Sequence, residues 1–232
     1  MRLKMGKILL VEGIDSVGKG TQCRLLAEAL TSMGWTVEQF SAPNYKSVSG
    51  IKVKNYLNGV YGVAGDIHPV LASSLYALDR VEQSAKVKKA VAEGKIVIMD
   101  RWTASNLAFQ GAKIEDDAER YRFITSQASY EYDLLGIPRP HRTFFLDADP
   151  DTARYLMRTR AVCDSSDQKM DQHESNLELL RKAHAVYGHM CDKMPAWRRI
   201  KCLEKNEMRS IESISRELIG LAVGFLNPDI KL

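Results

Sequence analysis

Residues 8–22 read ILLVEGIDSVGKGTQ, and the strand, glycine loop and helix that this stretch predicts decide the fold. Ile8 to Val11 is a short apolar run, which is typical of a strand buried on both faces. Positions 13–19 follow the pattern Gly-x-x-x-x-Gly-Lys, and helical periodicity continues from 21 to 33. A strand, a glycine loop and a helix in this order are the context that a phosphate-binding P-loop requires. The stretch therefore predicts a P-loop.

The residue types in this loop suit phosphate binding. Gly13 and Gly18 let the backbone turn tightly and bring its N–H groups against phosphate oxygens. The following helix directs its partial positive end at the same anion, and Lys19 adds a compact positive charge. The alternative is an ordinary glycine turn between a strand and a helix. As a P-loop, the segment is expected to bind ATP through Gly13, Ile14, Asp15, Ser16, Val17, Gly18, Lys19, Gly20 and Thr21.

One position departs from the usual P-loop pattern. Ser or Thr normally follows the lysine and places a hydroxyl on Mg²⁺, but Gly20 stands there and Thr21 comes one residue later. The arrangement resembles the Gly-Lys-Gly-Thr-Gln loop of adenylate kinases. It predicts that a metal is held mostly by phosphates, water and a carboxylate elsewhere in the chain.

Length and composition narrow the class of protein. The 232 residues suit one α/β domain, and the net charge of +4 suits anionic ligands but is too small to indicate nucleic acid. No apolar run approaches the roughly 20 residues of a membrane span. The four cysteines show no C-x-x-C pairing, which favours reduced thiols in a cytoplasmic protein.

Strand and helix patterns alternate along the chain. Further strands are expected at 37–40, 96–99, 143–146 and 200–203, and helices at 48–57, 70–93, 118–135, 150–160, 177–190 and 211–225. Alternation of this kind predicts a P-loop kinase fold of three layers, with a parallel sheet of about five strands flanked by helices. Residues 161–173 are polar and nearly free of large apolar groups, so we expect a mobile lid over about 154–174 within a single domain, 1–232.

Charged residues outside the loop extend the predicted site. Asp100 and Arg101 close an apolar strand, so both emerge at the carboxyl edge of the sheet near the P-loop. Asp100 suits a metal's water shell and Arg101 a second phosphate, although a structural ion pair at a strand end is the alternative. Asp15 repels phosphate unless it binds Mg²⁺ or a sugar hydroxyl. On the lid side stand three arginines suited to a transferred phosphoryl group: Arg154, Arg158 and Arg160.

Six motifs in a fixed order resemble thymidylate kinases, the nucleoside monophosphate kinases that phosphorylate dTMP. The motifs are Val11-Glu-Gly-Ile-Asp15, Pro43-Asn44-Tyr45, Tyr76-Ala-Leu-Asp-Arg80, Asp100-Arg-Trp-Thr-Ala-Ser-Asn106 with Phe109-Gln110-Gly111, Gly136-Ile-Pro-Arg-Pro140 and Asp171-Gln-His-Glu174. Together they cover nearly the whole chain. His173 stands where the family usually has Tyr or Phe, and His141 stands where Asp commonly follows the turn.

The resemblance implies a role for each matching residue. Tyr76 would stack on thymine, Arg80 would bind its O4 edge, and Arg101 would clamp the dTMP phosphate. Asp15 would lie between the sugar 3′-OH and Mg²⁺, and Glu174 would contact the metal or the substrate. The remaining dTMP-binding residues are expected to be Tyr45, Asn106, Phe109, Gln110 and His173. Arg154 is assigned to ATP, and Lys19, Arg101, Asp15, Arg158 and Arg160 are assigned to catalysis; which lid arginine is catalytic stays open.

The reaction that follows is transfer of the γ-phosphoryl group of ATP to dTMP with Mg²⁺, giving dTDP. The acceptor phosphate is already an anion, so no general base is needed, and positioning with charge neutralisation suffices. The resemblance also implies a homodimer. The alternatives are another nucleoside monophosphate or deoxynucleoside kinase, a regulatory GTP switch, for which no Asn-Lys-x-Asp motif is present, and a nucleic-acid binder, for which the basic residues are too scattered.

Overall fold

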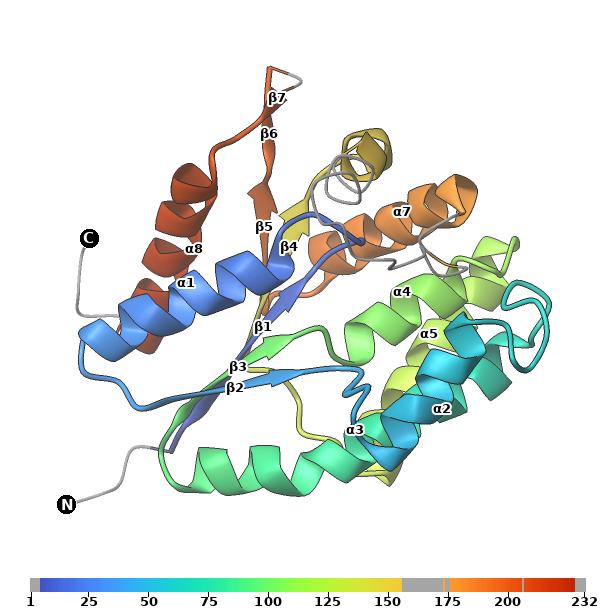
Figure 1. Ribbon diagram of the computed structural model, residues 1–232, viewed down its shortest axis with the longest axis horizontal. Coiled ribbons are helices and arrows are strands. Elements are labelled where there is room, and N and C mark those ends of the chain that lie inside the picture. The colour runs from blue at the N-terminus through green and yellow to red at the C-terminus, as the bar shows by residue number, and fades with distance from the viewer. Residues whose placement is uncertain (1–4, 156–172, 174–175, 206, 228–232) are drawn as a thin grey trace.

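Five parallel strands form the central sheet, in the order β2-β3-β1-β4-β5 (Figure 1). The computed structural model describes residues 5–155, 173, 176–205 and 207–227. The strands are β1 (Lys7–Glu12), β2 (Val37–Ser41), β3 (Ile96–Asp100), β4 (Arg142–Asp147) and β5 (Trp197–Lys201). The predicted parallel sheet of about five strands is therefore confirmed.

Helices cover both faces of the sheet because the inner strands are apolar on both sides. Ile8 and Leu10 of β1 pack in one cluster with helix α3 (Pro69–Ala92), whereas Leu9 and Val11 pack in another with α1 (Lys19–Ser32) and α8 (Ile211–Leu226). Helices α1 and α8 lie side by side (Figure 1). The other helices are α2 (Val48–Leu57), α4 (Thr103–Gly111), α5 (Asp117–Ser129), which continues into the π-helix η1 (Tyr130–Leu134), and α7 (Leu177–Lys193). This is the predicted three-layer α/β arrangement.

The structure differs from the predicted elements in three places. Helix α4 was not predicted, because nearly all of its residues are buried and its sequence lacks the apolar–polar period of a surface helix. Strand β5 begins at Trp197 rather than Ile200, since its charged residues obscure the strand pattern. A short antiparallel pair, β6 (Leu203–Glu204) and β7 (Glu207–Met208), was also missed. Of the predicted helix at 150–160, residues 150–155 are helical and the rest, like most of the expected lid, lies outside the described residues.

The strand register brings the predicted site residues to one edge of the sheet. Val11 of β1 and Ser41 of β2 both align with Asp100 of β3, and Glu12 aligns with Phe145 of β4. The P-loop, the loop after β2 and the turn after β3 therefore leave the sheet together. This carboxyl edge is where open α/β sheets place their ligands.

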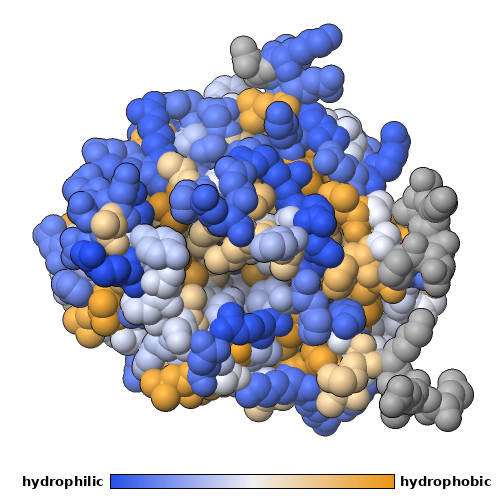
Figure 2. Space-filling view, turned by 180° about the vertical axis from the view of Figure 1, so that it is seen from behind, coloured by the Kyte–Doolittle hydropathy of each residue, from blue (hydrophilic) through white to orange (hydrophobic). Residues whose placement is uncertain are grey.

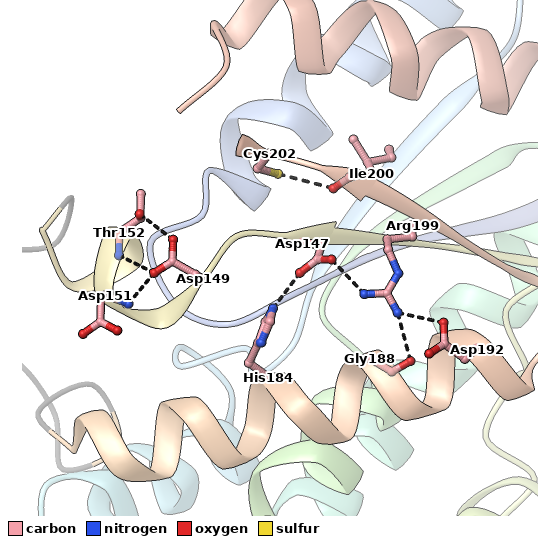
Figure 3. A network of polar contacts seen from close by, with 10 residues as sticks. All are labelled: Asp147, Asp149, Asp151, Thr152, His184, Gly188, Asp192, Arg199, Ile200 and Cys202. Atoms are coloured by element: carbon pink, nitrogen blue, oxygen red, sulfur yellow. Dashed lines mark hydrogen bonds and ion pairs between the residues drawn. The ribbon is translucent and has the colours of Figure 1, made fainter. Parts of the chain in front are cut away.

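A network of polar side chains connects α7 to strands β4 and β5 (Figure 3). Asp147, the last residue of β4, contacts His184 Nε2 of α7 at 2.6 Å and accepts a 2.8 Å bond from Arg199 of β5. Burial acts to raise the pKa of Asp147, but the bonds from His184 and Arg199 bring it below its usual value. Asp149 accepts bonds from the backbone N–H groups of Asp151 and Thr152, where the next helix begins. These contacts therefore hold in place two helices that follow β4 in the chain, the short one at 150–155 and α7.

The molecular surface is mixed in character. On the face shown in Figure 2, apolar residues form separated patches among polar ones. Within the described parts of the chain, none of the helices combines the length and the apolar character needed to cross a bilayer.

Gly50 of α2 is packed against the loop that follows β2. A Cβ at this position would lie 1.8 Å from the carbonyl oxygen of Asn44, which precedes Tyr45 in that loop. We therefore expect Gly50→Ala to lower the free energy of unfolding by about 1–3 kcal/mol, measured by urea denaturation. Gly220→Ala on α8 is the matched control, because no atom of the described residues outside its own stretch of helix lies within 4 Å of its added Cβ. Equal stability of the two variants would contradict this packing argument.

Candidate active site

The P-loop lines an open cavity at the carboxyl edge of the sheet. Gly18 and Ser16 have left-handed backbone conformations, with φ of 86° and 60°, and a Cβ on Gly13 would meet the Leu146 carbonyl oxygen at 2.8 Å. The side chains of Ile14 and Val17 pack in the hydrophobic core, so only their backbone is available to a ligand. The cavity lining comprises Asp15, Ser16, Gly18, Lys19, Gly20, Thr21, Ser41, Ala42, Pro43, Tyr45, Asp100 and Arg101.

Lys19 is a buried cation in this cavity. Its ammonium group donates a hydrogen bond to the carbonyl oxygen of Ile14 within the loop. Burial, assisted by the positive charge of Arg101, lowers the pKa of Lys19 to about 8, and Asp15 and Asp100 oppose this effect. A bound polyanion would supply the negative charge that raises this pKa again. The cavity thus contains an amine whose protonated form would be stabilised by a bound phosphate.

Asp100 has a carboxylate oxygen that is available to bind a metal ion, because it accepts no hydrogen bond from a described residue. Its Oδ1 is buried without a hydrogen-bond partner among those residues, and its Oδ2 lies 3.5 Å from where a Cβ on Gly20 would stand. Mg²⁺ prefers oxygen ligands and is usually bound through one or two carboxylates together with substrate phosphates. The carboxylate of Asp100 beside Gly20 therefore fits a magnesium ion. The carboxylate of Asp15 suits a metal less well, because it already pairs with Arg101.

Arg101 and Asp15 form an ion pair between two cavities. The Arg101 guanidinium donates to Asp15, to the Gly13 carbonyl oxygen at 3.2 Å and to the Ser105 hydroxyl at 3.2 Å. Burial acts to lower the pKa of Arg101, but Asp15 and other nearby acidic groups raise it above its usual value. Asp100 is therefore not the ion-pair partner of Arg101, so the structure does not support the simple strand-end pair that was the alternative.

The second cavity is walled by aromatic side chains. It shares Ala42, Pro43 and Tyr45 of the loop after β2, together with Asp15 and Arg101, with the P-loop cavity, so the ion pair is part of the boundary where the two cavities meet. Its lining includes all but one of the residues predicted to bind dTMP. They are Asp15, Tyr45, Tyr76, Arg80, Arg101, Asn106, Phe109 and His173, joined by Ala42, Pro43, Leu57, Trp102 and Ser105.

Arg80 is held at the base of this cavity by a carboxylate that the sequence did not reveal. Its Nε and one terminal nitrogen both donate to Glu131 at 2.6 Å, and both side chains are almost fully buried. Thr103 and Asn106 of α4 also donate to Glu131. Two of the three guanidinium nitrogens are thus engaged within the protein. Removing either partner would leave a buried, uncompensated charge.

Gln110 is not among the residues that line the aromatic cavity. It lies one turn beyond Asn106 on α4 and is fully buried, and neither atom of its amide has a hydrogen-bond partner among the described residues. Asn106 Oδ1 and the hydroxyl of Ser73 on α3 are likewise buried without described partners. These polar atoms lie on the two helices that carry Arg80 and Phe109. The dTMP-binding role predicted for Gln110 therefore has no direct support from the cavity.

His173 closes one side of the aromatic cavity. Its ring stacks on Phe109, with centroids 5.5 Å apart and planes at 4°, and its Nε2 lies 3.2 Å from the Tyr56 hydroxyl. Lys113 donates to the same hydroxyl at 2.8 Å. Burial, assisted by Lys113, lowers the pKa of His173 to about 4, so its ring is neutral at pH 7. A histidine thus provides the flat ring that the family usually takes from Tyr or Phe.

Several predicted site residues fall elsewhere. Arg158, Arg160 and Glu174 lie outside the described residues. Arg154 is half-buried in the short helix at 150–155 and is not part of either cavity lining. Glu131, Tyr56 and Lys113 were missed, because a single Glu, Tyr or Lys within a polar pattern gives no sign of a buried partner. Their roles emerge only from distances between elements.

Comparison with known proteins identifies relatives for nearly the whole chain. A family model described as thymidylate kinase matches residues 11–207. Thymidylate kinase of Exiguobacterium sibiricum is 28% identical over 229 residues, which cover 98% of this chain and 99% of the relative. Thymidylate kinase of Mycobacterium tuberculosis is 28% identical over 185 residues, covering 79% and 85%. The solved thymidylate kinase structure from Candida albicans covers 97% of this chain and 93% of that one, with a TM-score of 0.69 and 20% identity, and so supports the fold.

The depressed pKa of His173 predicts a pH-dependent stability. The unfolded chain binds this proton with a pKa near 6.5 and the folded chain with a pKa of about 4. Protonation therefore favours unfolding, and stability is lost as pH falls from about 6.5 to 4, by up to about 3 kcal/mol from this residue. We expect His173→Phe to remove this part of the pH dependence, measured by denaturant unfolding at several pH values. His189→Gln, an exposed position on α7, should retain it. An unchanged pH profile in His173→Phe would refute the argument.

Proposed function

The chain belongs to the thymidylate kinase family and is a dTMP kinase, and we propose that its two adjoining cavities are the sites of ATP and dTMP. The observation that carries this proposal is the position of Arg101 and Asp15 in both linings. A phosphate-binding loop lines one cavity and aromatic side chains line the other, and among the described residues Arg101 is the one cation that both linings contain. Two nucleotides bound in this way would meet at their phosphates.

The P-loop cavity suits the triphosphate. Its backbone N–H groups, the N-terminus of α1 and Lys19 all favour anions, and they converge on one side of the cavity. Mg²⁺ would be held by Asp100 together with phosphate oxygens, where it would neutralise phosphate charge. The metal roles predicted for Asp15 and Glu174 stay proposals, since Asp15 pairs with Arg101 and Glu174 is not described.

The aromatic cavity suits a pyrimidine nucleotide. Tyr76, Phe109 and His173 offer flat apolar surface for a base, while Arg80 and Asn106 offer polar atoms at its edge. Arg101 at the mouth would hold the acceptor phosphate by charge-assisted bonds. The acceptor oxygen is already anionic, so the protein's work is in-line positioning, neutralisation of charge and exclusion of water.

A lid arginine completes this proposal. We assign neutralisation of the transferred group to Arg158 or Arg160 and contact with ATP to Arg154, on the strength of the family resemblance. We also place the reaction in the cytoplasm, a location with which the free thiols at Cys23, Cys191 and Cys202 agree.

An acceptor panel tests the proposed function. With ATP and Mg²⁺, kcat/KM for dTMP should exceed that for AMP, CMP and thymidine by about a hundred-fold or more, because a wrong acceptor leaves polar groups unpaired. Lys19→Met should keep its fold by circular dichroism and lose about 10²–10³-fold in kcat. Comparable turnover of AMP or of thymidine would instead favour another nucleoside monophosphate kinase or a deoxynucleoside kinase.

The homodimer is proposed through helices α2 and α3. Large apolar side chains are exposed along both helices, and the backbone N–H of Ser49 donates to Glu82 to join them. The exposed apolar residues are Val48, Ile51, Val70, Leu71, Leu78 and Val81. A second copy covering this face would remove them from water.

Leu78→Glu tests this interface, because it places a charge in the middle of the exposed stripe on α3. We expect light scattering after size exclusion to give a dimer for the wild type and a monomer for Leu78→Glu. Ile211→Glu, at the equally exposed start of α8, is the control and should remain dimeric. A monomeric wild type at micromolar concentration would rule out the proposed assembly.

A further inference from the structure

A buried carboxylate that the proposed mechanism does not use lies directly before the P-loop. Glu12 is the last residue of β1 and is fully buried. Its Oε1 accepts hydrogen bonds from the backbone N–H groups of Trp102 at 2.9 Å and Ser105 at 3.2 Å. Its Oε2 accepts from the Ser105 hydroxyl at 2.6 Å and the Tyr187 hydroxyl at 2.9 Å. Each of its four partners donates, as an ionised carboxylate requires.

The backbone bonds to Glu12 fall at a strained turn. Arg101 has a φ of 65°, a left-handed conformation that residues with a side chain rarely adopt. Such a conformation persists only where the surroundings hold it. The N–H of Arg101 donates to Val11 at 3.1 Å, and the next N–H, that of Trp102, donates to Glu12. Two consecutive residues of β1 therefore fix the turn.

Glu12 also takes the place of a helix cap. Helix α4 begins at Thr103, and its own N-cap residue, Trp102, supplies no side-chain hydrogen bond. The carboxylate of Glu12 accepts from the N–H of Trp102, the N-cap residue, and from that of Ser105, the third residue of α4, and it suits the positive end of the helix. The start of α4 is thus set by a residue on the central strand.

A hydroxyl carries this contact to the Arg101 side chain. Ser105 Oγ donates to Glu12 and accepts from the guanidinium of Arg101. The Tyr187 hydroxyl oxygen of α7, which donates to Glu12, also lies 2.9 Å from this hydroxyl. Glu12 therefore reaches both the backbone and the guanidinium of Arg101 without contacting either cavity.

We propose that Glu12 is a positioning residue for dTMP: through Trp102 and Ser105 it fixes Arg101 so that its guanidinium points to the junction of the two cavities. The inference rests on the proposed role of Arg101 as the clamp for the acceptor phosphate. Loss of the Glu12 charge leaves Arg101 present but less well oriented. Acceptor binding then suffers, while the P-loop backbone and Lys19, which would hold ATP, stay in place.

Two substitutions separate this role from a general structural one. Glu12→Gln keeps the size of the side chain but turns one acceptor into a donor and removes the charge. Ser105→Ala removes the hydroxyl bridge to Arg101 together with the contact to Tyr187, leaves the Glu12 charge in place, and serves if Glu12→Gln does not fold. Each should raise the KM for dTMP about ten-fold, the scale of a supporting contact, with the KM for ATP within about two-fold of wild type.

A double-mutant cycle identifies Arg101 as the intermediary. In an Arg101→Lys background, Glu12→Gln should raise the KM for dTMP by less than about two-fold more, because the group it orients is gone. Glu217→Gln removes the charge of a partly exposed carboxylate on α8 that pairs with Arg209; it is the control substitution and should leave both KM values unchanged.

The outcomes distinguish this inference from the proposed function. Equal changes in both KM values, or full additivity with Arg101→Lys, would show that Glu12 acts on the fold as a whole and would overturn the inference. A large effect of Arg101→Lys with no effect of either Glu12→Gln or Ser105→Ala would overturn the inference alone. A wild-type KM for dTMP in Arg101→Lys would remove the proposed role of Arg101, and the inference with it.

Discussion

The contact between Arg101 and Asp15 is the interaction on which the rest of the site depends, because it lies where the two cavities meet. Arg101 and Lys19 are both buried cations, and the charge of Arg101 contributes to the lowered pKa of Lys19. An aspartate inside a phosphate-binding loop would repel phosphate, but it also offsets the repulsion between the positive charges of Arg101 and Lys19. Asp15 balances the two cations before phosphate enters, and nucleotide phosphates can then take over part of that balance.

The order of the strands in the sheet determines where these charged groups lie. Because β1 lies between β3 and β4, the P-loop emerges beside the turn that carries Arg101. The left-handed conformation of Arg101 redirects the chain into α4, which supplies Asn106 and Phe109 to the aromatic cavity. One strained turn therefore places both the shared arginine and one wall of the aromatic cavity, so a single backbone feature sets the relation between the two cavities.

The sequence predicted those parts of the site whose signals are local. Apolar runs predicted the three inner strands β1, β3 and β4, and the glycine spacing predicted the P-loop, because both patterns arise within a few neighbouring residues. Residues proposed for the acceptor pocket came from ordered motifs, and all the described ones except Gln110 line the aromatic cavity. Helix α4 escaped prediction even though its residues were named, since a helix buried on nearly every side carries no amphipathic period.

The parts that escaped prediction are buried charges whose partners are far apart in the chain. Glu131 lies 51 residues from Arg80, and Glu12 lies 90 residues from the N–H of Trp102. In the sequence such residues are expected to be exposed to solvent, because the local pattern shows that a residue is polar but does not show which residues it contacts in the fold. Burying a charge is favourable only when its donors are already in place, so its role is defined by the assembled fold. Glu12 and Glu131 both meet the start of α4, where local rules and tertiary structure disagree, and such disagreements are expected to mark functional sites.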